Sequence, residues 1–335
     1  MNNFGLLDAL TLIGALGMFL FGMNMMSESL QKVAGNKMRS ILSSMTKNRF
    51  IGVLSGIIIT SIIQSSSATT VLIVSFVNAG LLTLGESISV IMGANIGTTI
   101  TAWLVSLIGF KFSIAEIAIP LIGLSLPFIF SKNDKRKTIG HLIIGFSLLF
   151  LGLEYLKTGV PDIKSHPEIL NFLQNYTNMG FLSILLFLLV GTILTIIVQS
   201  SSATMAITLV MISQEWITFE IGAAMVLGEN IGTTITANIA AITANINSRR
   251  AALSHTLFNV FGVIWVLIIF YPFTKMVGYI VNFDATTHEN ALYALSMFHT
   301  LFNLCNTLIM IFLIKPLETI VCRIIPNKNT ENEFA

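Results

Sequence analysis

Two polar strings recur in this chain at one fixed offset. QSSSAT begins at Gln64 and again at Gln199. GxNIGTTITA, where x is Ala or Glu, begins at Gly93 and again at Gly228, so its two copies are separated by the same offset as the two QSSSAT strings. Two motifs that share one offset indicate an internal repeat, so the two halves of the chain are expected to build the same supersecondary unit.

The rest of the chain is apolar: 54% of its 335 residues are hydrophobic and only 10% are charged. Soluble globular proteins carry roughly 25% charged residues, so we expect an all-α polytopic membrane protein. The net charge of +2 is too small to indicate a nucleic-acid partner. The sequence contains no P-loop, GxSxG, HExxH or nucleotide fingerprint, and therefore predicts neither an enzyme nor a cofactor.

Seven apolar segments are long enough to be read as membrane crossings, at roughly 20 residues each. They cover residues 10–30, 85–109, 112–130, 140–155, 217–244, 251–273 and 291–314. With this count, 14 of the 18 Lys and Arg residues fall on one side of the membrane. The positive-inside rule then predicts an N-terminus outside the cell and a cytoplasmic C-terminus in the plasma membrane.

Each QSSSAT string lies inside an apolar stretch that does not fit a pair of full crossings. Residues 51–79 span 29 positions, whereas two membrane helices need about 40. This length predicts a re-entrant hairpin whose tip is the QSSS string. Residues 181–213 form the second predicted hairpin, with a longer first arm.

Equivalent points of the two copies are separated by three of the predicted crossings. An odd number of crossings inverts the second copy, so the fold class is two inverted-topology repeats, each with a hairpin and a transmembrane helix broken at GxNIGTT. Residues 1–137 form the first repeat, residues 138–275 the second, and residues 276–335 an extra helix and a cytoplasmic tail. This architecture is typical of secondary transporters, whose substrate binds near the midplane where the copies meet.

The hydroxyl-rich tips suit two kinds of ion. Serine and threonine hydroxyls donate hydrogen bonds to an oxyanion, and their oxygens can also coordinate a hard cation such as sodium. The motifs contain no Lys or Arg, so a bound anion would need co-bound cations and helix dipoles to balance its charge. This coupling predicts symport. The alternative is that the hydroxyls only join transmembrane helices to one another.

Other polar residues give weaker signals. Glu229 is the one acid inside either motif, at the position of Ala94, and could bind a cation or form an interhelical hydrogen bond. HTLFN occurs at His255 to Asn259 and again at residues 299–303, where helix packing is favoured over a metal site. Asn24 and Glu154 lie at matching points of the repeat and could line the interface between the copies.

Paired QSSS strings, each followed by GxNIGT, resemble the sodium-dependent phosphate cotransporter family of type II, with its bacterial members. The resemblance covers most of residues 10–244, and SHTLFN adds to it. It implies sodium-coupled transport of inorganic phosphate, with both ions held at the hairpin tips and the GxNIGT helices. The implied binding residues are Gln64, Ser65, Ser66, Ser67, Thr69, Asn95, Thr98, Thr99, Gln199, Ser200, Ser201, Ser202, Thr204, Asn230, Thr233 and Thr234, with Glu229, His255 and Asn259 in a supporting or cation-binding role.

Several alternatives stay open at this point. The substrate could be another small oxyanion or a dicarboxylate, although the motifs lack the Arg that a carboxylate usually recruits. The protein could also be a membrane sensor that binds phosphate without transporting it. A homodimer is a possible assembly. Many bacterial relatives carry a C-terminal domain that resembles phosphate-regulatory PhoU proteins, and residues 315–335 do not imply one.

Overall fold

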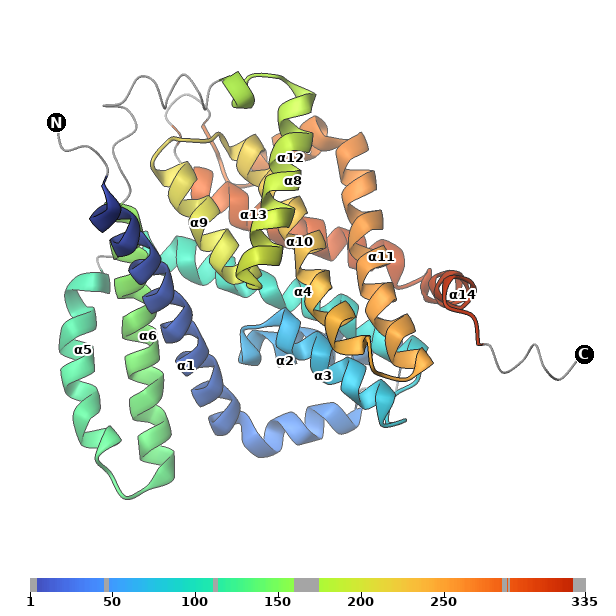
Figure 1. The fold of residues 1–335 in the computed structure, drawn as a ribbon, viewed down its shortest axis with the longest axis horizontal. Coiled ribbons are helices and arrows are strands. Elements are labelled where there is room, and N and C mark those ends of the chain that lie inside the picture. Colours follow the sequence, from blue (N-terminus) through green and yellow to red (C-terminus); the bar gives the residue numbers. More distant parts are fainter. Residues whose placement is uncertain are drawn as a thin grey trace, which may run out of the picture.

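The computed structural model describes residues 5–44, 48–110, 114–159, 175–284, 288 and 290–327, and in these ranges every regular element is helical (Figure 1). The helices are α1 (Leu6–Ser44), α2 (Arg49–Ile63), α3 (Ser66–Asn78), α4 (Leu84–Leu104) with a π-helical turn η1 (Val105–Gly109), α5 (Ile114–Ile129), α6 (Asp134–Gly159), α8 (Phe181–Val198), α9 (Ser201–Ser213), α10 (Phe219–Ala241), α11 (Ile246–Ile268), α12 (Phe270–Ile280), α13 (Ala291–Met310) and α14 (Ile314–Ile324).

Six helices of the described ranges are long and apolar enough to cross a membrane: α1, α4 with η1, α6, α8, α11 and α13. Together they make this a multi-pass membrane protein, as the composition predicts. The set differs from the expected seven crossings at three helices. Helices α5 and α10 fall outside it, whereas α8, which the sequence predicts as a hairpin arm, falls inside it with 18 residues.

Glycines bring two helix pairs into close contact, and the contacts occur at equivalent positions of the two copies. A Cβ atom on Gly93 of α4 would lie 1.9 Å from the carbonyl oxygen of Val53 in α2. A Cβ atom on Gly228 of α10 would lie 2.0 Å from the carbonyl oxygen of Leu188 in α8. Because no side chain fits in these gaps, the backbones of α2 and α4, and of α8 and α10, pack directly against each other.

The prediction that the transmembrane helices break at GxNIGTT is wrong. Helix α4 continues without interruption through residues 93–99, and α10 continues through residues 228–234. The glycines serve the close helix contacts instead of a break in the backbone. In the first copy the helical geometry changes only afterwards, at the π-helical turn Val105–Gly109.

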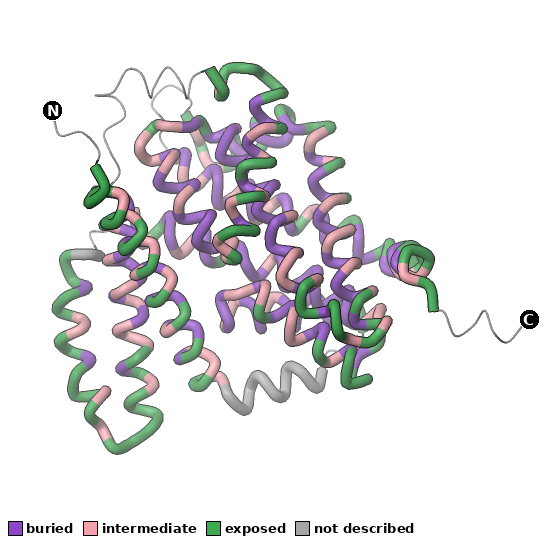
Figure 2. The backbone as a smooth tube through the Cα atoms, in the orientation of Figure 1, coloured by how far each residue is buried: buried purple, intermediate pink, exposed green. Residues whose placement is uncertain are grey.

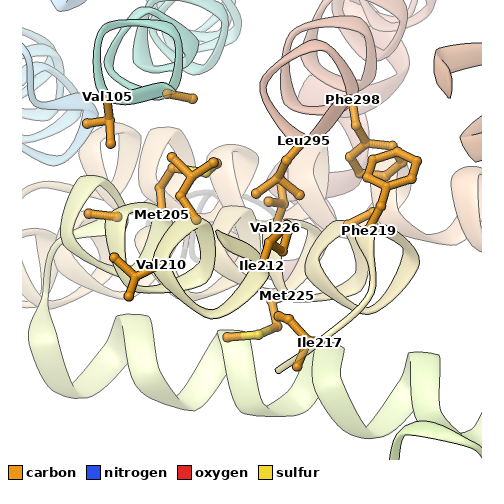
Figure 3. Packing of buried hydrophobic residues seen from close by; sticks show 14 of the residues in the cluster. Val105, Met205, Val210, Ile212, Ile217, Phe219, Met225, Val226, Leu295 and Phe298 are labelled. Atoms are coloured by element: carbon orange, nitrogen blue, oxygen red, sulfur yellow. The ribbon is translucent and has the colours of Figure 1, made fainter. Parts of the chain in front are cut away.

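The centre of the molecule is the best-buried part. Figure 2 shows the buried residues gathered on the central helices, whereas α5 at one edge is mostly exposed. In Figure 3, Val226 of α10 and Leu295 of α13 lie between Met205 of α9 on one side and the rings of Phe219 and Phe298 on the other. This apolar core holds α9, α10 and α13 together.

Helices α1, α5 and α6 lie together on one side of this centre (Figure 1). Helix α1 packs closely on α6, because a Cβ on Gly22 would lie 2.3 Å from the backbone nitrogen of Leu149. Helix α1 also contacts the first hairpin, where the Ser27 hydroxyl donates a hydrogen bond to the carbonyl oxygen of Ile63. One face of α1 therefore lies next to the hairpin tips.

Near the C-terminus, two expected crossings end earlier than predicted. The segment 251–273 divides into α11, which ends at Ile268, and α12, with Pro272 in its first turn. The segment 291–314 divides into α13, which ends at Met310, and α14, with Pro316 in its first turn. Proline suits the first turn of a helix and interrupts a preceding one, which accounts for both new helix starts.

Candidate functional site

A single residue in left-handed conformation ends the first arm of each hairpin. Gln64 follows α2 with φ of 55°, and Gln199 follows α8 with φ of 54°. The next residue caps the second arm: Ser65 Oγ accepts from the backbone nitrogen of Ala68 at 3.1 Å. Ser200 does the same for the backbone of α9. The chain therefore reverses within two residues, and each second arm begins at the tip.

Both hairpin tips line one cavity of about 230 Å³. We call this the tip cavity. Its lining consists of both QSSS strings, one apolar residue of α8 and one face of α1: Leu20, Met23, Asn24, Ser27, Gln64, Ser65, Ser66, Ser67, Val198, Gln199, Ser200, Ser201 and Ser202. The two copies of one string, far apart in the sequence, thus meet at one place.

The electrostatic character of the tip cavity comes from the backbone. Helix α3 begins at Ser66 and α9 begins at Ser201, so the first turns of both helices adjoin the cavity. The first N–H groups of a helix have no acceptor within the helix and carry a partial positive charge, which favours an anion. The side chains of the lining are mainly those of serine and glutamine, and none of them is charged.

Thr69 and Thr204 are used inside the hairpins. Thr60 Oγ1 donates to Thr69 Oγ1 at 3.1 Å, and Thr195 Oγ1 donates to Thr204 Oγ1 at 3.2 Å. Both Thr69 and Thr204 are fully buried and are absent from the lining of the tip cavity. Their hydroxyls therefore join the two arms of each hairpin behind its tip.

The polar side chains of GxNIGTT bond to their own helices. Asn95 Nδ2 donates to the carbonyl oxygen of Ile91 at 2.9 Å, and Asn230 Nδ2 donates to that of Val226 at 2.8 Å. The threonine hydroxyls make the same kind of bond within α4 and α10: Thr98, Thr99, Thr233 and Thr234. All six side chains are buried, and none lines the tip cavity.

The two tip glutamines are held differently. Gln64 is buried; its Nε2 donates to the carbonyl oxygen of Ser61, and its Oε1 accepts from Thr101 Oγ1 at 3.0 Å. Gln199 is exposed at the tip cavity. The two tips therefore have the same backbone conformation, but the Gln64 amide is buried and hydrogen-bonded whereas the Gln199 side chain is exposed.

Helix α1 supplies cavity residues that the motifs do not reveal. Asn24, noted for its matching position in the repeat, lines the tip cavity, and so does Ser27. Ser27 lies three residues after Asn24, so helical spacing from Asn24 could have identified it. Glu154, the expected counterpart of Asn24, forms a salt bridge with Lys157 at 2.8 Å and is not part of the lining.

Glu229, His255 and Asn259 are buried polar residues outside the tip cavity. Glu229 Oε1 accepts from Thr208 Oγ1 at 3.0 Å, whereas its Oε2 has no hydrogen-bond partner. Neither ring nitrogen of His255 has a partner, nor has Oδ1 of Asn259. Within the described ranges, no group of three or more His, Cys, Asp or Glu residues could hold a metal ion.

The chain resembles phosphate transporters over both of its halves. The model of the family described as "Na+/Pi-cotransporter" matches residues 18–158 and residues 165–303. The "Uncharacterized protein YqeW" of Bacillus subtilis is 31% identical over 92% of this chain and 96% of its own length. "Putative inorganic phosphate export protein YjbB" of Escherichia coli K12 is 26% identical over 93% of this chain, which spans 55% of that protein.

A human relative is similar over a shorter region. "Sodium-dependent phosphate transport protein 2B" of Homo sapiens is 39% identical over 29% of this chain and 14% of its own length. No solved structure matches the chain. Because the two family matches together take in most of the sequence, the protein belongs to the Na+/Pi-cotransporter family.

Proposed function

We propose that the protein is a sodium-coupled symporter of inorganic phosphate that works by alternating access in the plasma membrane. The observation that carries this proposal is the tip cavity, where two hairpins begin their second helices beside the serines and glutamines of equivalent strings, with Ser27 of α1 in the same lining. The names of two relatives, for phosphate export and for sodium-dependent phosphate transport, support phosphate as the substrate.

The chemistry of the lining accounts for coupling between the two ions. Phosphate would receive hydrogen bonds from serine hydroxyls and from the first N–H groups of α3 and α9. These partial charges do not neutralise a dianion in a region of low dielectric. Sodium bound by hydroxyl, amide or carbonyl oxygens at the same tips would supply the missing charge, so each ion favours the binding of the other.

We further propose that both hairpins are re-entrant and that the second repeat is inverted. At 1.5 Å per residue, the 15 residues of α2 and the 13 of α3 reach about 22 and 20 Å, less than the roughly 30 Å core of a bilayer. Helix α8, with 18 residues, reaches about 27 Å and would enter more deeply. The positive-inside bias favours a cytoplasmic C-terminus. In this arrangement the hairpins would move against α1 and α6.

The GxNIGTT side chains have a supporting role in this proposal. They lie on α4 and α10, which pack against the first arms of the hairpins through Gly93 and Gly228. Their hydrogen bonds to their own helices satisfy polar groups that would otherwise be costly inside a membrane. Asn95, Asn230 and the neighbouring threonines would therefore set the position of the tips and become ion ligands only if a tip moves.

Uptake of radiolabelled phosphate into proteoliposomes tests the tip cavity as the binding site. Ser66→Ala and Ser201→Ala each remove a hydroxyl at the start of a second arm and should reduce uptake at least tenfold, since a hydrogen bond to a charged ligand is worth about 1.5–3 kcal/mol. Ser75→Ala is the matched control, because Ser75 lies on α3, is exposed and bonds only to the carbonyl oxygen of Val71.

Full activity of both tip variants would reject the tip cavity as the phosphate site.

Competition by sulfate, arsenate and a dicarboxylate against phosphate identifies the substrate among anions. Binding of phosphate to the wild-type protein without any flux would favour a sensor instead of a transporter. Coupled transport is reversible, so flux measured in both directions decides whether export, as in the name of the Escherichia coli relative, is the favoured direction.

A further inference from the structure

Three cavities follow helix α1 in a row, and neighbouring cavities share a residue. The first is the tip cavity of about 230 Å³. The second, of about 250 Å³, shares Asn24 with it and is also lined by Glu28, Ser29, Lys32 and His141. The third, of about 510 Å³, shares Lys32 with the second and reaches Asp134, Lys135 and Thr138 at the start of α6. We call this row the α1 path.

The side chains of the α1 path lie on one face of α1. Asn24, Glu28 and Lys32 are spaced by four residues, which places them above one another on an α-helix. All three are exposed, and His141 of α6 is exposed in the same cavity. The α1 path thus extends from the tips to the loop between α5 and α6, seen at the lower end of these helices in Figure 1.

The charges of the α1 path are not paired with one another. Within the described ranges, one salt bridge is found, between Lys157 and Glu154. The Lys32 ammonium therefore forms no ion pair with Glu28 or Asp134. An unpaired ammonium attracts a phosphate ion, and an unpaired carboxylate attracts sodium. The α1 path therefore offers both charges to the two ions, whereas the tip cavity offers only dipoles and hydroxyls.

We propose that the α1 path is the route by which phosphate and sodium pass between the cytoplasm and the tip cavity, with Lys32 as the residue that collects phosphate. The inference rests on the proposed function of the tip cavity. Lys32 and Lys135 lie on the side that the positive-inside bias makes cytoplasmic. Phosphate moves from Lys32 past His141 to the Asn24 amide, the residue that the second cavity shares with the tips.

The kinetic test replaces Lys32 and measures phosphate flux from each side of oriented proteoliposomes. Lys32→Gln should raise the half-saturating phosphate concentration on the cytoplasmic side roughly three- to tenfold at low ionic strength, the lower end of electrostatic steering effects. The change should shrink when choline chloride is raised to about 1 M, where the Debye length falls to about 3 Å. The value measured from the opposite side should not change.

Lys315→Gln is the matched control, because it removes the same charge from an exposed residue of α14 whose cavity shares no residue with the α1 path. The proposal is overturned if Lys32→Gln behaves like Lys315→Gln, or if its effect is equal from both sides.

A labelling test separates failure of the α1 path from failure of the proposed function. In a Cys305→Ser, Cys322→Ser background, Asn24→Cys should react with a membrane-impermeant thiol reagent added on the cytoplasmic side, and inorganic phosphate should slow the reaction. Reaction from the opposite side only, or no reaction, overturns the α1 path even if transport is normal. Absence of phosphate flux in the wild-type protein rejects the proposed function, while labelling from the cytoplasmic side still identifies an aqueous route.

Discussion

Replacing Gly93 by alanine tests the close contact that positions the first hairpin. A Cβ atom at Gly93 would lie 1.9 Å from the carbonyl oxygen of Val53 and 3.0 Å from the backbone nitrogen of Ile57. Ordinary contacts begin at 3.4 Å. Since both of these neighbours are backbone atoms, no side-chain rotation relieves the clash, and α2 and α4 must separate by about 1.5 Å to restore normal packing.

The cost can be estimated from these distances. Inserting a methyl group into a well-packed interior costs about 1–3 kcal/mol, and a backbone clash belongs at the upper end of that range. Alanine regains up to about 1 kcal/mol from its higher helix propensity. We therefore expect Gly93→Ala to lower the free energy of unfolding by about 2 kcal/mol. Phosphate uptake per folded protein should also fall, because the separation of the helices moves the tip.

Thermal unfolding in detergent, followed as loss of the monodisperse fraction, measures the stability, and proteoliposome uptake measures the function. Gly17→Ala is the control, because Gly17 lies in α1 and has no atom within 4 Å of an added Cβ. Gly228→Ala should repeat the effect in the second copy, where the carbonyl oxygen of Leu188 lies at 2.0 Å. A Tm of Gly93→Ala at or above that of Gly17→Ala would refute the packing argument.

Three further predictions concern single side chains. Gln199→Gly should have a free energy of unfolding about 1 kcal/mol higher than that of Gln199→Ala, because the left-handed φ of 54° strains a residue with a Cβ. The glycine variant should therefore have the higher Tm, and equal Tm values would contradict this. Glu229→Gln keeps an acceptor for Thr208, and Glu229 lies outside the tip cavity where the proposed function places sodium, so the variant should fold and keep the sodium concentration for half-maximal uptake; a roughly tenfold rise in that concentration, a loss of about 1.4 kcal/mol of binding, would instead identify Glu229 as a cation ligand. Burial raises the pKa of Glu318 in α14 above its usual range, although Lys315 opposes the shift. The folded state then binds more protons than the unfolded state, so the docking of α14 should weaken as pH rises from about 4.5 through the raised pKa. Hydrogen exchange of α14 amides, corrected for intrinsic pH dependence, should show this trend in the wild-type protein and lose it in Glu318→Gln.

The hairpin tips could be predicted from the sequence because their signal is local. A polar string inside the apolar stretch 51–79 leaves few alternatives in a membrane, and the structure turns the chain at Gln64 and Gln199. The common offset of the strings similarly predicts that both line one cavity, and they do. The prediction needs only lengths and the cost of polar groups in lipid.

The course of the GxNIGTT helices could not be predicted in the same way. Glycine permits both a helix break and a close helix contact, and only the neighbouring helix decides between them. At Gly93 that neighbour is the backbone of Val53, which belongs to a different helix. The place of Lys32 in the α1 path could not be predicted for the same reason, since it depends on which face of α1 lies next to the cavities. Ser27 is different, because helical spacing from Asn24 does point to it.

The most direct test of the account is uptake of radiolabelled phosphate into proteoliposomes, with the accompanying charge movement recorded, in sodium and after replacement of sodium by potassium. The account predicts that a sodium gradient drives phosphate accumulation and that potassium reduces uptake to the level of empty liposomes. Uptake of the same rate and extent in both salts would contradict sodium coupling at the tip cavity.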